Sequence, residues 1–231
     1  METLESVRRS EWERLYPSLT NPSWLVLRRR REIFRAWISR LNGRSLDVLD
    51  VGGRMQPYRP LLTDRLGRYL AIDLLQTPIV DAVSRGENIP FASGVFDLVV
   101  CTQMLQYVPD PGAVIAEIHR LLKPGGYLFL SAPAIALRDA DEECWRFFPH
   151  SLRHLLGQFG KREISPEGGY LVGFFRMLNT GVDVLVRYRF LRAFFHWTLC
   201  PVVNLAGETL DRITFSKNDQ LATNYSAWAR K

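Results

Sequence analysis

The chain has 231 residues, 47% of them hydrophobic and 23% charged, and its 16 glycines and 13 prolines are ordinary numbers for a globular protein. This composition excludes a disordered or fibrous chain, and the length favours one α/β domain over two full domains. The formal net charge is +6 with only four lysines among the 30 basic residues, so the protein suits acidic partners such as phosphate groups or anionic membranes.

The amino-terminal residues METLESVRRSEWERLY are charged and lack an apolar signal core, so we expect a cytoplasmic protein. Cys101, Cys144 and Cys200 are widely spaced, which fits neither a disulfide framework nor paired zinc ligands, and we expect no metal site. No run reaches the roughly 18 uncharged apolar residues that a membrane-spanning helix needs.

Residues 1–43 are predicted to form a helical lead. Thr20 and Asn21 are expected to cap a helix with Pro22 in its first turn, and apolar residues then recur at helical spacing up to Gly43. The run Arg28 to Arg31 falls within this helix. Because four consecutive residues spread around a helix, we interpret the run as a solvated face rather than a binding patch.

Residues 45–172 alternate apolar runs with helical stretches, which predicts a mostly parallel sheet of βαβ units. The expected strands are LDVLDVG, RYLAIDL, VDAV, FDLVVC and GYLFLSAP, and their continuous apolar content is typical of strands covered on both faces. Residues 111–122 form an amphipathic helix capped by Asp110 and ended by KPGG, and a short helix is expected over 151–158.

Residues 173–215 are predicted to be an aromatic helical insertion, and 216–231 a closing antiparallel strand that alternates like an edge strand. On a single helix over 184–200, Arg189, Arg192 and His196 would share one narrow stripe among apolar residues. Such a helix must be covered. We expect 174–206 to be buried against its own domain or a second copy, and the alternative is peripheral contact with a membrane.

Two features indicate a nucleoside-containing cofactor at the first strand ends. Asp50, Gly52 and Gly53 form a glycine turn that lets backbone N–H groups approach a ligand, although such turns are common as purely structural features. Asp73 ends the next strand, where a carboxylate can accept hydrogen bonds from a ribose diol. The alternative for Asp73 is a helix cap.

The run ENIPFASGVFDLVVCTQMLQYVPDPGAVIAEIHRLLKPGGYLFLSAP is much more specific. It resembles the second half of class I S-adenosylmethionine-dependent methyltransferases of the type 11 family, and the resemblance covers about 46–169. Within the family, GGRMQPYRPLL and the WRF segment resemble a branch associated with glycan and polysaccharide synthesis. The implied fold is Rossmann-like, with a mostly parallel twisted sheet and an antiparallel closing strand.

The resemblance implies S-adenosylmethionine as the cofactor, S-adenosylhomocysteine as the product, and no metal. Asp50, Gly52 and Gly53 would surround its methionine part, and Asp73 would bind the ribose. The remaining implied contacts follow the later strands: Leu74, Asn88 and Ile89 near the adenine, and Thr102, Gln103 and Met104 beneath the sulfonium. Asp97 is interpreted as structural because it opens its strand.

The sequence departs from the family pattern at several positions. Arg54 stands where a second glycine is usual, and Arg85 replaces an acidic residue that often accepts the adenine amino group. Gln106 and Tyr107 replace the last two residues of a common Leu-Glu-His run. These departures leave open a catalytically inactive protein that keeps the fold and acts as a binding or scaffolding partner.

The loop 134–148 is expected to overhang the methyl group. Methyl transfer requires mainly alignment of the acceptor, and a hydroxyl acceptor also needs a base. Glu143, His150 and Arg138 are the candidates, each with a simpler role as a solvated or helix-opening residue. We expect O-methylation of a small molecule or a glycan, including a lipid-linked one, and no nucleic-acid substrate, since the fourth strand is not followed by the Asp/Asn-Pro-Pro-aromatic run of amino-group enzymes.

Overall fold

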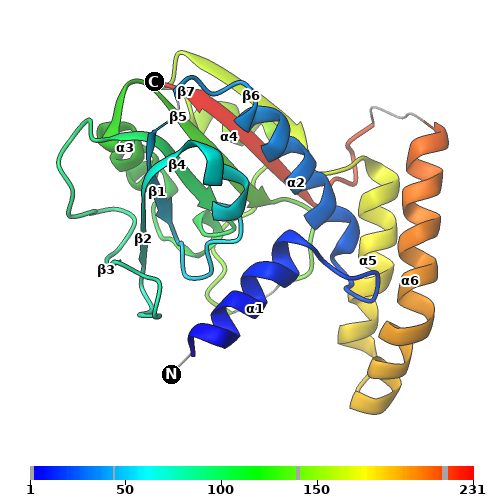
Figure 1. The fold of residues 1–231 in the computed structure, drawn as a ribbon. Helices are drawn as coiled ribbons and strands as arrows, with labels where there is room; N and C mark the ends of the chain where they lie inside the picture. The colour runs from blue at the N-terminus through cyan, green and yellow to red at the C-terminus, as the bar shows by residue number, and fades with distance from the viewer. Residues whose placement is uncertain (1–2, 44, 139–140, 215–217) are drawn as a thin grey trace.

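The structure is a computed structural model, and it describes residues 3–43, 45–138, 141–214 and 218–231. Its helices and strands are arranged around one sheet (Figure 1). The helices are α1 (Leu4–Leu15), α2 (Trp24–Ile38), α3 (Pro111–Leu121), α4 (Pro149–Leu155), α5 (Tyr170–Leu185) and α6 (Arg189–Thr214), with 3-10 helices η1 (Arg59–Arg65) and η2 (Leu105–Tyr107). The strands are β1 (Leu46–Val51), β2 (Leu66–Asp73), β3 (Ala82–Val83), β4 (Phe96–Thr102), β5 (Leu122–Pro133), β6 (Lys161–Pro166) and β7 (Asn224–Arg230).

The seven-stranded sheet has the order β3-β2-β1-β4-β5-β7-β6, and β7 runs antiparallel to both of its neighbours. Apolar side chains cover both faces of the central strands. One core lies against α3 and α4, and the other lies against α1, α2 and η1. The predicted fold class is confirmed: the sheet is mostly parallel and Rossmann-like, with an antiparallel strand formed by the carboxyl-terminal residues.

The position of β7 differs from the expected edge strand. It lies between β5 and β6, and five of its seven residues are buried. The alternation in NYSAWAR therefore does not separate a solvent-exposed face from a buried one. Its small residues meet tightly packed neighbours, as where Ala227 lies between Leu130 and Ile164, while Trp228 packs beside Tyr127 on the other face.

The leading helix α2 starts later than the sequence indicates. Its first residue is Trp24, preceded by Ser23, and the predicted cap at Thr20 and Pro22 is wrong. Asn21 instead turns the chain ahead of the helix, because its Oδ1 accepts a hydrogen bond of 2.8 Å from the Ser23 N–H. This local Asx-type bond competes with a helical cap.

The arginine run of α2 is not a solvated face. The Arg30 side chain is buried and forms a two-pronged ion pair with Glu167, through Nε–Oε1 and Nη2–Oε2 contacts of 2.8 Å each. Arg28 and Arg29 bind the Glu208 carboxylate of α6 at 3.2 Å. The spreading of consecutive residues around a helix thus brings the arginines to different neighbours, which the sequence alone does not show.

The predicted helix over 184–200 is interrupted. The chain leaves helical geometry at 186–188, and α5 and α6 form a hairpin that projects from the side of the sheet (Figure 1). The basic stripe partly faces the other helix, with Arg192 and His196 at 3.8 and 3.0 Å from Asp183 Oδ1. Asn179 and Asn204 join the two helices by a buried hydrogen bond of 3.0 Å.

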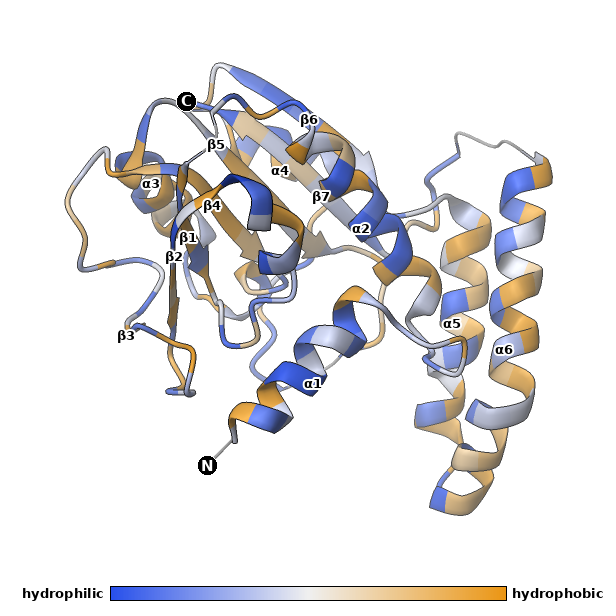
Figure 2. Ribbon diagram, in the orientation of Figure 1, coloured by the Kyte–Doolittle hydropathy of each residue, from blue (hydrophilic) through white to orange (hydrophobic). Residues whose placement is uncertain are grey.

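Much of the hairpin is not buried against its own domain, so of the expected ways of covering it a second copy or a membrane remains. Apolar residues lie along the outward side of α6 (Figure 2). Trp197 is 77% exposed and Leu185 84% exposed. The hairpin extends beyond α2, so nothing in the described part of the chain is placed to cover its far half.

Candidate functional site

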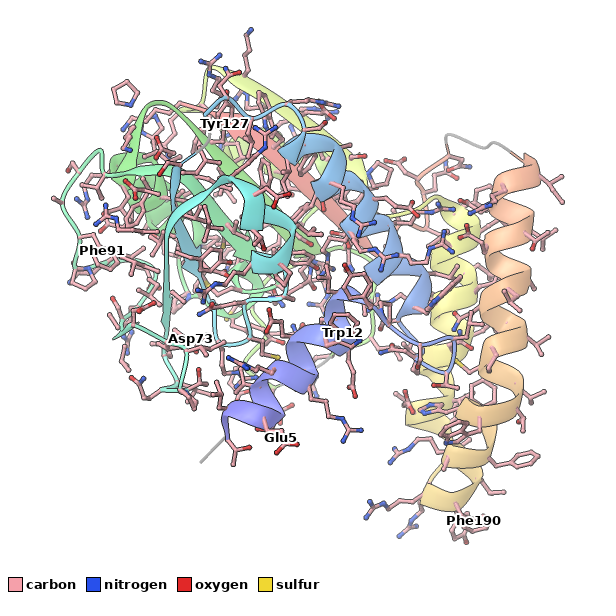
Figure 3. All side chains as sticks on the ribbon, in the orientation of Figure 1. Glu5, Trp12, Asp73, Phe91, Tyr127 and Phe190 are labelled. Atoms are coloured by element: carbon pink, nitrogen blue, oxygen red, sulfur yellow. The ribbon has the colours of Figure 1, made fainter. Side chains whose placement is uncertain are left out.

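The candidate site lies where β2, β1 and β4 end side by side. The sheet order changes direction between β1 and β4, and in sheets of this kind ligands bind at such a switch, at the carboxyl ends of the strands. Figure 3 shows Asp73 at this edge and Tyr127, in the middle of β5, away from it.

The glycine turn after β1 is shaped by close contacts. Gly52 has a φ of +77°, and a Cβ there would lie 2.8 Å from the Cβ of Met104. A Cβ on Gly53 would lie 2.8 Å from the Cβ of Asp50. Both glycine N–H groups donate to the Ile72 carbonyl at 2.9 Å, so the expectation that they point at a ligand is wrong. The glycines are needed because the turn lies against β2 and the loop after β4.

Asp50 is fully buried beneath this turn. Its Oδ2 accepts a hydrogen bond of 2.6 Å from the Tyr69 hydroxyl. Burial raises the pKa of the Asp50 carboxyl to about 7. The Tyr69 hydrogen bond opposes this increase in the pKa, and the Asp73 charge adds a smaller increase of its own. Asp50 therefore holds a proton up to near-neutral pH.

Asp73 is at the position expected of a ribose ligand. Its Oδ1 accepts the Leu75 N–H at 2.9 Å, which fixes the carboxylate in a turn at the end of β2. Oδ2 accepts no hydrogen bond from the described residues, so it can accept one from a ligand. Leu74 is 64% exposed and contributes an apolar surface beside it.

The two residues expected at the adenine edge have different environments. Asn88 is exposed, and its carbonyl accepts a hydrogen bond from the Ser84 hydroxyl at 2.7 Å. Ile89 is 2% exposed within the core, and its N–H donates to Glu117. Ile89 is therefore engaged by the protein itself, and Asn88 is the one whose side chain is open to a ligand.

The loop after β4 returns to the glycine turn. Gln103 has a φ of +53°, with its N–H donating to the Ser131 carbonyl at 2.8 Å and its side chain to the Ser131 hydroxyl at 2.9 Å. This left-handed residue directs Met104 against Gly52. Thr102, the last residue of β4, is half-buried and pairs with Ser131.

A loop held by Gln106 lies over the same edge. The Gln106 carbonyl accepts the N–H groups of Cys144 and Trp145 at 2.7 and 3.3 Å, and the Trp145 indole donates to the Val108 carbonyl at 2.9 Å. The Gln106 Oε1 is buried without a hydrogen-bond partner among the described residues. This acceptor was not among the predicted site residues, although the departure from Leu-Glu-His marks its position.

The structure does not bring the three catalytic candidates together. Arg138 forms an exposed ion pair of 2.9 Å with Asp141, and Glu143 pairs with Arg146 at 2.6 Å while its side chain is only 4% exposed. His150 instead lines a separate hollow of about 490 Å³ beside α4 and β6, with Arg153, His154, Arg162 and Ile164.

Arg54 follows the two glycines and is half-exposed. Its guanidinium forms no ion pair with any residue that the structure describes. Its carbonyl accepts a hydrogen bond of 3.3 Å from the Thr77 hydroxyl, which joins the turn to the segment after β2. The expectation that the Arg54 side chain points away from the methyl-transfer centre stays a prediction.

Comparison with known proteins matches the part of the chain that contains β1, β2 and β4 to a known type of domain. Residues 49–130 match the methyltransferase domain family. Ubiquinone biosynthesis O-methyltransferase of Pseudomonas aeruginosa PAO1 is 40% identical over 92 residues, which is 38% of this chain and 35% of that protein. The Xanthomonas oryzae pv. oryzae protein of the same name is 62% identical over 39 residues, 17% of this chain and 16% of its own length. The alignment thus spans about a third or less of these curated relatives.

Solved structures share the fold over most of the chain. The (4+2)-cyclase SpnF has a TM-score of 0.58 at 18% identity and covers 99% of this chain and 96% of its own. Phosphoethanolamine N-methyltransferase 2 of Haemonchus contortus, solved with S-adenosyl-L-methionine, has a TM-score of 0.55 at 14% identity and covers 97% of this chain and 59% of its own. These likenesses concern the fold alone, and the first shows that the fold also serves other chemistry.

Residues 49–130 thus match the expected type of domain, for which the sequence predicts S-adenosylmethionine as the cofactor. The residues fit this cofactor in one specific respect: Asp73 offers a free carboxylate oxygen at the end of β2, beside the glycine turn. The glycan-associated branch has no support among these relatives. Within the described residues, no three His, Cys, Asp or Glu side chains gather as metal ligands, and no helix has the length and apolar content needed to cross a membrane.

Proposed function

We propose that the protein transfers the methyl group of S-adenosylmethionine to a hydroxyl group. The observation that carries the proposal is the edge of the methyltransferase domain itself, where Asp73 and the Gly52–Met104 contact lie at adjoining strand ends. The curated relatives are named as O-methyltransferases, which favours oxygen as the acceptor atom. The cofactor supplies an electrophilic methyl group on a sulfonium, and the protein aligns the acceptor for in-line displacement.

The acceptor is proposed to be a small molecule or a glycan. Its hydroxyl must lose a proton as the carbon–oxygen bond forms. Among the candidates, Glu143 is the proposed base, because its carboxylate is nearly buried on the loop tied to Gln106. Arg138 is engaged with Asp141 in solvent, and His150 lines a hollow elsewhere.

The second candidate function is a catalytically inactive binding protein with the same fold. It is favoured by Arg54 and by the two glycine N–H groups that already donate to Ile72. Calorimetric titration with S-adenosylmethionine and S-adenosylhomocysteine separates the two. Binding of both ligands, followed by transfer of a radiolabelled methyl group to hydroxyl compounds, supports the enzyme. Absence of binding by the folded protein leaves the inactive alternative.

The role of Glu143 is tested with Glu143→Gln. Loss of turnover with unchanged cofactor affinity is expected, because the amide keeps a hydrogen bond but cannot take a proton at neutral pH. Asp141→Asn is the matched control on the same loop, since the Asp141 side chain is 88% exposed. Equal activity of the two variants would remove Glu143 from the mechanism.

A further inference from the structure

The far half of the α5–α6 hairpin exposes an unusual amount of apolar surface. We call this surface the hairpin tip, and its main side chains are Leu185, Tyr188, Phe190, Phe194, Trp197 and Leu199. Phe190 and Phe194 are 69% and 65% exposed. Large exposed apolar surface of this kind on a folded protein marks a place where something else binds.

The geometry of the hairpin tip distinguishes a partner that packs on one side of α6 from an apolar medium that surrounds the helix. Successive residues of a helix are separated by about 100°, so Trp197 and Leu199 point about 200° apart. Both are exposed, at 77% and 53%. A second copy packed on α6 would cover one of these directions and leave the other in water. An apolar medium that surrounds the helix covers both.

The charges at the tip are mostly positive, with Asp183 as the acidic residue beside three arginines. Arg187, Arg189 and Arg192 are the only charged residues between Val184 and Gly207. Arg192 faces Asp183, whereas Arg187 and Arg189 form no ion pair within the described part of the chain. Arginines beside Trp, Tyr and Phe suit the boundary of a bilayer, where the guanidinium groups reach anionic headgroups and the rings lie among acyl chains. A dimer formed through two hairpin tips would instead bring the arginines of the two copies close to each other.

We propose that the hairpin tip anchors the protein in the interface of an anionic lipid bilayer. Figure 3 shows Phe190 and Asp73 both on the side of the molecule away from Tyr127. Exposed apolar residues also follow the strands β2 and β5 that lead into the loops of this region, namely Leu74, Leu75, Leu137, Trp145 and Phe148. A docked molecule thus presents its site to the membrane surface. The corollary that the acceptor is carried by a lipid rests on the proposed function, whereas the anchoring does not.

Vesicle flotation tests the anchoring with the full chain. Phosphatidylcholine vesicles containing phosphatidylglycerol should carry the protein upward at low salt, and pure phosphatidylcholine vesicles should carry much less. The double variant Phe194→Ser/Trp197→Ser should lower the partition coefficient about tenfold or more. Its control is Trp12→Ser, which makes the same change at a 62% exposed tryptophan on α1 and should retain binding.

The arginines are tested by Arg187→Gln/Arg189→Gln, which should reduce binding to the anionic vesicles alone and remove its salt dependence. Arg8→Gln/Arg9→Gln on α1 makes an equal charge change away from the tip. Protein that stays unbound with anionic vesicles at low salt overturns the proposal. A dimer that Phe194→Ser/Trp197→Ser dissociates would assign the tip to a second copy. Cofactor titration of every variant keeps this result separate from the proposed methyl transfer.

Discussion

Asp73 is the residue on which the cofactor assignment depends most directly. Its carboxylate is held by one backbone hydrogen bond and has an oxygen left for a ribose hydroxyl. Substituting the group should therefore affect binding more than folding. The two carboxylate oxygens of Asp73 have different roles. Substitution by asparagine would keep the oxygen that accepts the Leu75 N–H but would remove the negative charge.

Asp73→Ala is expected to weaken S-adenosylhomocysteine binding by about 1.5 to 3 kcal/mol, the usual contribution of a hydrogen bond to a charged group. Asp73→Asn should weaken it less, because its Oδ1 preserves the turn. Isothermal titration calorimetry measures both. Asp64→Ala, at an exposed aspartate in η1, is the control, and equal affinities of Asp73→Ala and Asp64→Ala would exclude the ribose contact.

Asp50 should make the stability of the ligand-free protein depend on pH. Its pKa rises from an ordinary value of about 3.9 in the unfolded chain to about 7 in the folded one. The folded state then binds more protons between these values, so this group's contribution to the free energy of unfolding falls as pH rises from 4 to 7.

Asp50→Asn removes this effect while keeping an acceptor for the Tyr69 hydroxyl. Relative to the parent, the variant should gain stability as pH rises, on the order of 4 kcal/mol by pH 8, with little difference near pH 4. Urea unfolding followed by tryptophan fluorescence gives both free energies. Asp64→Asn should keep the parent's pH profile. Parallel profiles for Asp50→Asn and the parent would show that the carboxyl titrates normally.

At the scale of elements, one buried network joins α2 to the antiparallel end of the sheet. Glu167, just after β6, accepts hydrogen bonds from Arg30 and from the hydroxyls of Ser131 and Ser226. Asn224 donates to its other oxygen at 3.1 Å. Burial opposes ionisation of Glu167, but Arg30 and these donors outweigh it and hold the pKa below its ordinary value. The carboxylate therefore stays charged at neutral pH.

Glu167→Gln should destabilise the fold by about 3 to 5 kcal/mol, because it leaves the buried Arg30 guanidinium without a counter-charge. The comparison is Arg40→Gln, which breaks the exposed Arg40–Glu163 pair of 2.6 Å and should cost at most about 1 kcal/mol. Denaturant unfolding of both variants measures the difference. Similar losses in the two would mean that the buried network contributes no more than a surface ion pair.

The elements that were predicted correctly are those that a local sequence pattern is enough to specify. Buried parallel strands such as β1 and β4 are continuous apolar runs, and α3 combines an amphipathic pattern with Asp110, whose side chain accepts the Ala113 N–H at 3.0 Å. The break between α5 and α6 was missed because arginines and aromatics continue through it at helical spacing. What turns the chain is contact between the two helices, such as the Asn179–Asn204 bond.

At the scale of the whole molecule, the errors concern partners that are far apart in sequence. Arg30 meets Glu167 at a separation of 137 residues, and no local pattern indicates that contact. The site shows the same limit. The sequence placed Asp73 at a strand end, but it could not show that Ile72 takes the glycine N–H groups or that Glu117 takes that of Ile89.

The sheet order makes β7 the strand on which β6 depends. Ala227→Pro removes one N–H from the middle of a strand that is paired on both sides, and prolines are not accommodated there. We expect a loss of about 3 kcal/mol or more. In this variant, the backbone amides of β6 (161–166) should exchange hydrogen faster than those of β1. Unchanged protection of 161–166 would show that β6 is held by α4 rather than by β7.

The interior place of β7 also has a consequence for synthesis on the ribosome. A chain is made from its amino terminus, and β1, β2, β4 and β5 can pair as they emerge. The strand β6 emerges next, but its one neighbour in the sheet is made only after the entire α5–α6 hairpin. Until then β5 and β6 both present open edges, which are templates for association with other chains. Newly made chains should therefore depend on chaperones most during this interval, when the apolar hairpin and the unpaired edges are exposed together.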